Sequence, residues 1–334
     1  MDSSRRVERV RVSLGTAIVL GLSEGVIDAE PTTAYLLTYF EGRCTANCAF
    51  CPQARGSSSR TDMLSRVIWP DFRVEDVVAG IKRAFKQGKI MRVCIQALNY
   101  PDVHRDILLL VREIRDKCNV PISVSCQPLS SVEISALAEA GVERVSIALD
   151  AATEEIFSIV KGENVGGPYR WNQHFDALRA ALKIIGRGRV TTHLIVGLGE
   201  SEEEFIHMLQ RSHDMGIFPA VFAFTPIPGT RMSSHPRPPI DSYRRIQVAH
   251  YLITRGLGRY ENMRFKDGRL IDFGIPKNDI KRIILSGEPF LTSGCPGCNR
   301  PYYNEEPRGP LYNFPRKPTR KDIEMIQMEM NMEL

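Results

Sequence analysis

The 334-residue sequence has no long apolar segment, and the longest apolar run near its amino terminus, residues 16–22, is far too short to cross a bilayer. The first residues also lack the apolar stretch and small-residue cleavage site of a secretory leader. Neither sign of charge is concentrated, because 44 basic and 39 acidic residues are interspersed and form no polycationic arm for nucleic acid. We therefore expect a cytoplasmic protein that binds neither membrane nor nucleic acid.

Low-complexity tracts and repeats of fixed period are absent as well, while the 43% hydrophobic content is ample for a folded core. What recurs is an alternation of short apolar runs with amphipathic stretches, which predicts βαβ units and a parallel sheet. Ser201 and Glu204 have the spacing of a capping box at the start of one helix. Seven or eight such units favour a (β/α)8 barrel of the α/β class. We expect an N-terminal helical extension over 1–32, the barrel over 33–291, and a C-terminal segment with a terminal helix over 292–334.

The eight cysteines are the most informative residues, and three of them, Cys44, Cys48 and Cys51, follow the first predicted strand. Thiolates at this spacing on a loop can bind three corners of an iron–sulfur cube and leave the fourth iron open to a small molecule. The alternative is a structural zinc site, which needs a fourth ligand nearby. No His or Cys occurs between positions 52 and 93, so the cluster is favoured.

This Cys-x3-Cys-x2-Cys pattern, with the aromatic Phe50 before the last cysteine, resembles the signature of the radical S-adenosylmethionine superfamily. The resemblance implies that Cys44, Cys48 and Cys51 hold a 4Fe–4S cluster whose open iron binds S-adenosylmethionine. One electron from a low-potential donor then releases a 5′-deoxyadenosyl radical, which removes hydrogen from an unactivated carbon.

Further segments resemble biotin synthase and imply how the nucleotide is held. Gln96 and Ala97 are expected beside the methionine moiety, and Asp150 at the ribose hydroxyls, although Asp150 is also placed to be a helix N-cap. His174 stands where biotin synthase has an arginine for the methionine carboxylate. The segment 194–200 is similar to the motif beside adenine, and its contacts are expected from Ile195, Gly197 and Leu198.

The resemblance also implies a second cluster that donates sulfur. Cys94 and Cys126 each end a predicted strand, and the carboxyl ends of barrel strands face one cavity. The third biotin synthase cysteine corresponds here to Thr191, while the tail adds Cys295 and Cys298, a spacing suited to iron or zinc. We expect Cys94, Cys126, Cys295 and Cys298 to hold an auxiliary 4Fe–4S cluster, with Arg269 a possible nearby ligand. The alternatives are buried strand cysteines that act as small apolar residues, and a zinc or redox pair in the tail.

Residues 292–303 and 312–315 are similar to biotin synthase-like microbial proteins, some of which form a two-protein lipoyl synthase. This resemblance implies sulfur insertion into an octanoyl chain on a lipoyl carrier protein, together with a companion radical enzyme. Biotin synthase itself, or another barrel enzyme of the superfamily, is the alternative. A zinc-stabilised binding module is the alternative without catalysis.

Overall fold

A computed structural model describes residues 7–305 and 309–330. Its central sheet has eight strands in the order β10-β9-β8-β7-β6-β2-β1-β5. Six neighbouring strands of the sheet are parallel: β2 (Thr33–Thr38), β6 (Arg92–Gln96), β7 (Ile122–Cys126), β8 (Arg144–Ile147), β9 (Val190–Val196) and β10 (Phe218–Ala223). The remaining two, β1 (Arg9–Val12) and β5 (Asp71–Arg73), extend the sheet antiparallel beyond β2.

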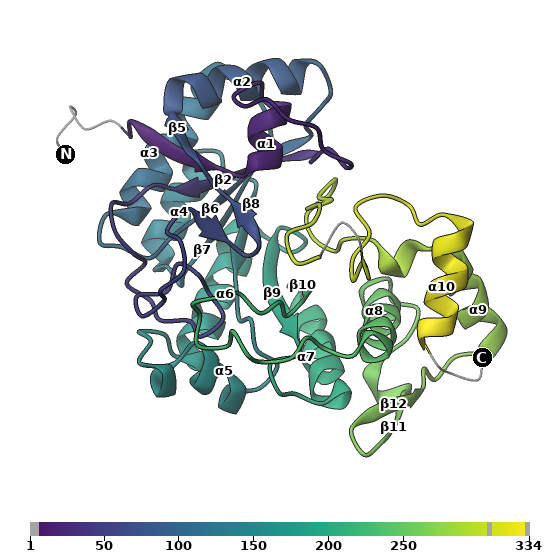
Figure 1. Cartoon of the computed structure of the whole chain (residues 1–334). Coiled ribbons are helices and arrows are strands. Elements are labelled where there is room, and N and C mark those ends of the chain that lie inside the picture. The colour runs from purple at the N-terminus through teal and green to yellow at the C-terminus, as the bar shows by residue number, and fades with distance from the viewer. Residues whose placement is uncertain (1–6, 306–308, 331–334) are drawn as a thin grey trace.

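Helices follow most of the parallel strands and cover the sheet (Figure 1). The α-helices are α1 (Leu14–Val19), α2 (Val74–Lys86), α3 (Val103–Lys117), α4 (Ser131–Glu139), α5 (Glu154–Val160), α6 (Trp171–Ile185), α7 (Glu202–Met215), α8 (Ile240–Thr254), α9 (Lys277–Ser286) and α10 (Arg320–Met330). Helix α7 begins as predicted, because the Ser201 side chain accepts from the Glu204 N–H and Glu204 bonds back to Ser201.

Several short elements lie outside the central sheet and the α-helices. They are the hairpins β3 (Met63–Leu64) with β4 (Val67–Ile68) and β11 (Arg264–Lys266) with β12 (Arg269–Asp272), and the 3-10 turns η1 (Glu163–Val165), η2 (Tyr260–Asn262) and η3 (Glu288–Phe290). Neither hairpin joins the central sheet.

Residues 292–305, called the closing segment below, connect the two sides of the parallel strands. On the β2 side, the Arg300 N–H donates to the Tyr35 hydroxyl at 2.8 Å. On the β10 side, the Val221 N–H donates to Ser293 Oγ at 2.8 Å, and the Asn304 amide donates to the Ala223 carbonyl at 3.2 Å. The closing segment thus satisfies polar groups of β10 that an edge strand leaves open.

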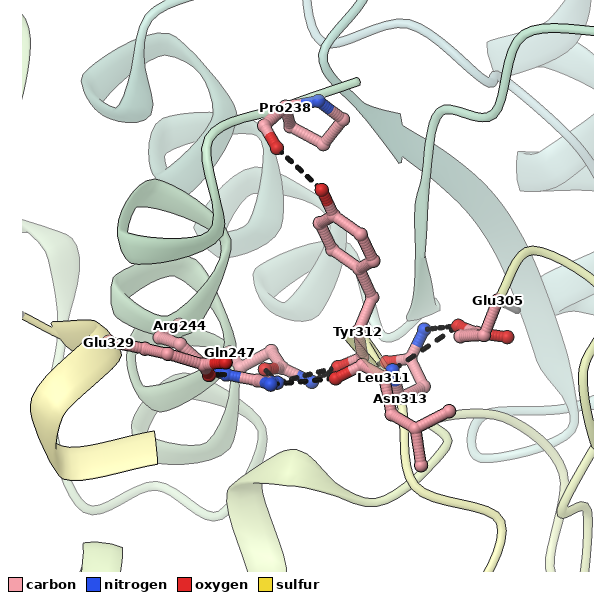
Figure 2. A network of polar contacts seen from close by, with 8 residues as sticks. All are labelled: Pro238, Arg244, Gln247, Glu305, Leu311, Tyr312, Asn313 and Glu329. Atoms are coloured by element: carbon pink, nitrogen blue, oxygen red, sulfur yellow. Dashed lines mark hydrogen bonds and ion pairs between the residues drawn. The ribbon is translucent and has the colours of Figure 1, made fainter. Parts of the chain in front are cut away.

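A buried polar network ties the rest of the tail to α8 (Figure 2). The Arg244 guanidinium, whose side chain is 1% exposed, donates to the carbonyls of Leu311 and Tyr312 and pairs with Glu329 of α10. Glu305 accepts from the backbone and side-chain amides of Asn313. Helix α10 lies beside α8 and α9, which fixes the tail against the barrel (Figure 1).

The predicted α/β barrel is confirmed, but it is not built from eight repeated units. Six parallel strands form the arc, two antiparallel strands extend it, and the closing segment crosses its open side. The N-terminal region contains the short helix α1, as expected, and also β1, which joins the sheet. Within the described ranges, no helix is long and apolar enough to span a membrane.

Candidate active site

The three-cysteine loop begins after β2, at the carboxyl edge of the parallel strands, and its backbone is firmly held. The Cys44 N–H donates to the Gln53 carbonyl at 3.2 Å, and the Ala49 N–H donates to the Val160 carbonyl at 2.7 Å. Asn99, which follows β6, accepts from the Thr45 N–H at 2.8 Å and donates its own N–H to Cys44 Sγ at 3.2 Å. The loop is therefore fixed by its own turn at Gln53, by Val160 at the end of α5 and by Asn99 after β6.

The three thiols of this loop lie close enough to repel one another as thiolates. Burial raises the pKa of Cys48, and the charges of Cys51 and Cys44 raise it further. Burial, followed by the charge of Cys44, raises the pKa of Cys51 to about 12. Thiols gathered in this way favour a cation that removes their protons, and a backbone N–H already points at Cys44.

The donor set therefore fits an iron–sulfur cluster with three thiolate ligands. Among the described residues, no three His, Cys, Asp or Glu side chains gather tightly enough for a single metal ion. A cube differs from a single ion because each thiolate binds a different iron.

A cavity opens beside this loop and is called the upper cavity. Five of the predicted nucleotide contacts and cluster ligands line it: Phe50, Cys51, Gln96, Asp150 and Ile195. Its other lining residues are mainly apolar: Pro52, Leu64, Ser65, His193, Phe222, Ala223, Phe224, Thr225, Ile227, Arg300 and Asn304. The upper cavity thus joins the three-cysteine loop to residues from β6, β8, β9 and β10.

Asp150 stands at the end of β8 and carries a buried ion pair. Lys161 Nζ lies 2.6 Å from Asp150 Oδ2 and donates to the Ala148 carbonyl at 2.5 Å. The two side chains are 8% and 12% exposed, so the pair is held away from water. The N-cap of α5 is Thr153, which leaves Asp150 free of that structural role.

His174 is not in the wall of the upper cavity, so the structure does not bring it to the other predicted nucleotide contacts. Its ring is buried on α6, with Nδ1 3.0 Å from the Arg170 carbonyl, and packs edge-on against Phe157 and Tyr169. Burial, with the charge of Lys161, lowers the pKa of His174 to about 3, so the ring is neutral at pH 7. A neutral ring cannot replace an arginine, and Lys161 is the buried cation in this region.

The remaining predicted nucleotide contacts lie outside the wall of the upper cavity. The N–H groups of Gly197 and Leu198 donate to the Glu200 carboxylate at 2.6 and 3.0 Å. Gly197 has φ +96°, and a Cβ there would meet Pro238 at 2.9 Å, so the turn requires glycine for packing. Ala97 is partly buried and donates its N–H to the Ser125 carbonyl.

A second thiol group occupies the interior at the amino ends of the strands. Cys94, Cys295 and Cys298 line a common cavity, the lower cavity. Their mutual charges contribute to raising the pKa of Cys94 and Cys298, for which burial is the largest cause. The Tyr35 hydroxyl lies 3.2 Å from Cys298 Sγ, and the Ser123 hydroxyl lies 3.5 Å from Cys295 Sγ.

Comparison with known proteins agrees with this geometry. The sequence profile of the Radical SAM superfamily matches residues 39–211, which is more than half of the chain. The chain belongs to the radical S-adenosylmethionine superfamily.

Within that superfamily, the chain is similar to biotin synthases. It is 27% identical over 169 residues to the biotin synthase of Magnetococcus marinus, a match that covers 50% of this chain and 49% of that protein. It is 26% identical over 288 residues to the biotin synthase of Xanthomonas campestris pv. campestris, covering 81% of this chain and 76% of that protein. The crystal structure of methylornithine synthase shares the fold, with a TM-score of 0.52 and 14% identity, over 67% of this chain and 63% of that one.

Two predicted auxiliary ligands of this radical SAM protein lie away from the second thiol group. Cys126 does not line the lower cavity, although Ser123, Val124 and Ser125 of the same strand do. The charged group that acts on its thiol is Glu133 of α4, and none of the other three cysteines contributes to the shift of its pKa. Its Sγ lies 4.0 Å from the Ser146 carbonyl. Arg269 is half exposed on the β11–β12 hairpin, 3.5 Å from Asp241. The expected set of four cysteines is therefore reduced to three in the structure.

Sequence reasoning missed Lys161, Tyr35, Ser123 and Arg300. Lys161 and Ser123 carried no motif, and Tyr35 lay inside a strand that reads as ordinary core. Arg300 did carry a signal, because it follows Cys298 by two residues and so had to share its environment. It lines both the upper and the lower cavity, together with Gln96, His193 and Phe222.

Proposed function

We propose that this radical SAM protein inserts sulfur into an unactivated C–H bond, as one component of a lipoyl synthase acting on a protein-bound octanoyl chain. The observation that carries the proposal is the pair of thiol groups whose cavities share a wall. Gln96, His193, Phe222 and Arg300 each line both cavities. A substrate between the two groups could be activated from one side and receive sulfur from the other.

The wall of the upper cavity supports an aliphatic substrate. Phe50, Leu64, Phe222, Phe224 and Ile227 provide apolar surface next to Cys51. An extended acyl chain gains free energy from leaving water for such a surface, in proportion to the area buried. The carrier-protein end of the chain would remain outside, where Leu64 and Ser65 of the β3–β4 hairpin border the cavity.

When bound, the radical cluster and S-adenosylmethionine supply a carbon radical able to remove hydrogen from the substrate, and the auxiliary cluster supplies sulfur. The chain's own residues provide the setting. The loop contacts of Asn99 fix the first thiols, and Asp150, oriented by Lys161, has an oxygen for the ribose hydroxyls. Apolar side chains around Cys51 exclude water, which strengthens the electrostatic interactions inside the cavity.

The partners that this proposal requires are an octanoylated lipoyl carrier protein, a companion radical enzyme for the second sulfur, and a low-potential electron donor. Two sulfur atoms enter the octanoyl chain, and a single auxiliary cluster next to a single radical site explains one insertion. We therefore expect the companion to perform the other.

Sulfur incorporation into an octanoyl-lysyl peptide tests the proposal. The purified anaerobic protein, with a reductant and S-adenosylmethionine, should form a singly sulfurated peptide alone and a lipoyl peptide with the companion. Formation of 5′-deoxyadenosine without any sulfurated peptide, with and without the companion, would contradict it.

Biotin synthase activity is the second candidate, favoured by 26% identity to the Xanthomonas enzyme over 81% of the chain. The same assay with dethiobiotin separates the two. Conversion of dethiobiotin to biotin, with no sulfur incorporated into the octanoyl peptide, would identify biotin synthase activity instead.

A further inference from the structure

Arg300 is a half-buried cation whose place in the barrel the proposed function leaves unexplained. Its guanidinium carbon lies 4.3 Å from the centroid of the Phe222 ring and 4.9 Å from that of Tyr303. Its Nε is fully buried and has no hydrogen-bond partner among the described residues. The buried Glu305 carboxylate is close enough to interact with this charge, but its hydrogen bonds come from Asn304 and Asn313. A cation placed between two rings away from water is costly unless an anion completes its environment.

The backbone indicates that this placement is enforced. Arg300 has φ +33°, a value that side-chain-bearing residues rarely adopt. Its N–H is fixed by the Tyr35 hydroxyl at 2.8 Å, and the same hydroxyl lies 3.2 Å from Cys298 Sγ. One tyrosine thus orients both the arginine and the cysteine, and strained backbone of this kind gathers at functional sites.

The anion that this position fits is on the thiol side of the wall. Arg300 lines the lower cavity together with Cys94, Cys295 and Cys298, and its charge favours the thiolate forms of Cys94 and Cys298. Three thiolates around an iron–sulfur core add negative charge to the lower cavity, which Arg144 also lines. Arg92 acts on Cys94 and Cys298 as well, but its guanidinium already pairs with Glu143 at 3.0 Å. His193, which also lines both cavities, does not supply a compensating charge, because burial lowers its pKa to about 4.

We propose that Arg300 is a positioning residue that faces an iron–sulfur cluster held by Cys94, Cys295 and Cys298 and balances its negative charge at the boundary with the upper cavity. The inference rests on the proposed function, since it requires the auxiliary cluster. It goes further by limiting the thiolate ligands to three and by assigning the cation that stabilises the reduced, more negative state. It also places that cation where the substrate passes.

The test is a redox titration of the loaded protein, in which the two clusters are followed separately by electron paramagnetic resonance. Arg300→Met should lower the reduction equilibrium constant of the auxiliary cluster by about tenfold, equivalent to about 59 mV for one electron, because it removes a nearby charge from a poorly solvated site. Arg300→Lys, which keeps the charge, should restore most of this shift. The radical cluster should keep its potential and its response to S-adenosylmethionine, which also shows that the variant is folded.

Arg255→Met is the matched control, because Arg255 also lies over an aromatic ring, 5.6 Å from the Tyr251 centroid, but on the exposed surface. An unchanged auxiliary potential in Arg300→Met, with both clusters present, would overturn the role of Arg300 and leave the proposed function standing. A wild-type protein with only the radical cluster would overturn both. An equal shift in Arg255→Met would show that the effect is not specific to the lower cavity and would also overturn it.

Discussion

Arg244 offers the clearest test of how the tail is fastened to the barrel, because one buried side chain makes all the key contacts. Its Nη2 donates to the Leu311 carbonyl at 2.6 Å and its Nη1 to the Tyr312 carbonyl at 2.8 Å, while Nε pairs with Glu329 at 2.9 Å (Figure 2). Arg244→Met removes the donors and keeps most of the side-chain volume. The Leu311 carbonyl and the Glu329 carboxylate then lose this partner, while the Tyr312 carbonyl keeps the Gln247 amide at 2.8 Å.

The expected cost follows from the burial of this network. Removing one partner of a buried ion pair costs about 3–5 kcal/mol, because the remaining charge stays away from water. The Arg244 side chain is 1% exposed and that of Glu329 is 15%, so the pair is slightly screened and the lower part of this range applies. We expect Arg244→Met to lower the free energy of unfolding by about 3–4 kcal/mol, a large share of the stability of an ordinary domain.

Urea denaturation followed by circular dichroism measures this change, and limited proteolysis shows where the chain opens. Cleavage should begin in the tail that Arg244 holds, before the barrel is cut. Arg320→Met is the control on α10, because the Arg320 side chain is 94% exposed and its pair with Glu324 lies in water. A change below about 1 kcal/mol in Arg244→Met would refute the reasoning, since it would mean that the network adds nothing beyond its desolvation cost.

Three other changes test individual sites. Iron analysis should find an unchanged iron content in Cys126→Ala and a lower one in Cys298→Ala. Loss of iron in both variants would show that Cys126 is also a cluster ligand. Lys161→Met should weaken S-adenosylmethionine binding at least tenfold in equilibrium dialysis, because it leaves Asp150 without the cation 2.6 Å away; unchanged binding would remove Asp150 from the nucleotide site. Burial lowers the pKa of His250 to about 4. Between pH 6.5 and pH 4 the ring therefore stays neutral in the folded protein but takes up a proton in the unfolded chain. The stability that this ring contributes above pH 6.5 is lost as the pH falls towards 4. His250→Gln should therefore reduce the loss of unfolding free energy between pH 7 and pH 5 by about 2 kcal/mol in urea titrations, and an unaltered pH slope would contradict this assignment.

Much of the fold was predictable because it depends on local signals. The apolar runs, the helical spacings and the Ser201–Glu204 capping box are properties of neighbouring residues, and the structure reproduces them. The way the barrel closes was not predictable in this manner. It depends on the closing segment meeting Tyr35 and Val221 across most of the chain length, through contacts that leave no periodic pattern.

The candidate site shows the same division. Cys44, Cys48 and Cys51 share one loop, so their spacing alone brings them together. Cys94 and Cys126 were predicted to share a cavity because both lie near strand ends, but the direction of a strand side chain depends on register. Cys94 pairs with Ser123 in the sheet, whereas Cys126 lies three residues further along β7, outside the wall of the lower cavity and 4.0 Å from the Ser146 carbonyl.

The central claim is that two separate thiol groups, one in each cavity, hold two iron–sulfur clusters. Iron analysis and electron paramagnetic resonance of two triple variants test it most directly. The wild-type protein, purified without oxygen, should contain about eight irons. Replacement of Cys44, Cys48 and Cys51 by alanine should leave about four irons and abolish 5′-deoxyadenosine formation, while replacement of Cys94, Cys295 and Cys298 should leave about four and retain it. About four irons in the wild type, with none lost in the second variant, would contradict the account.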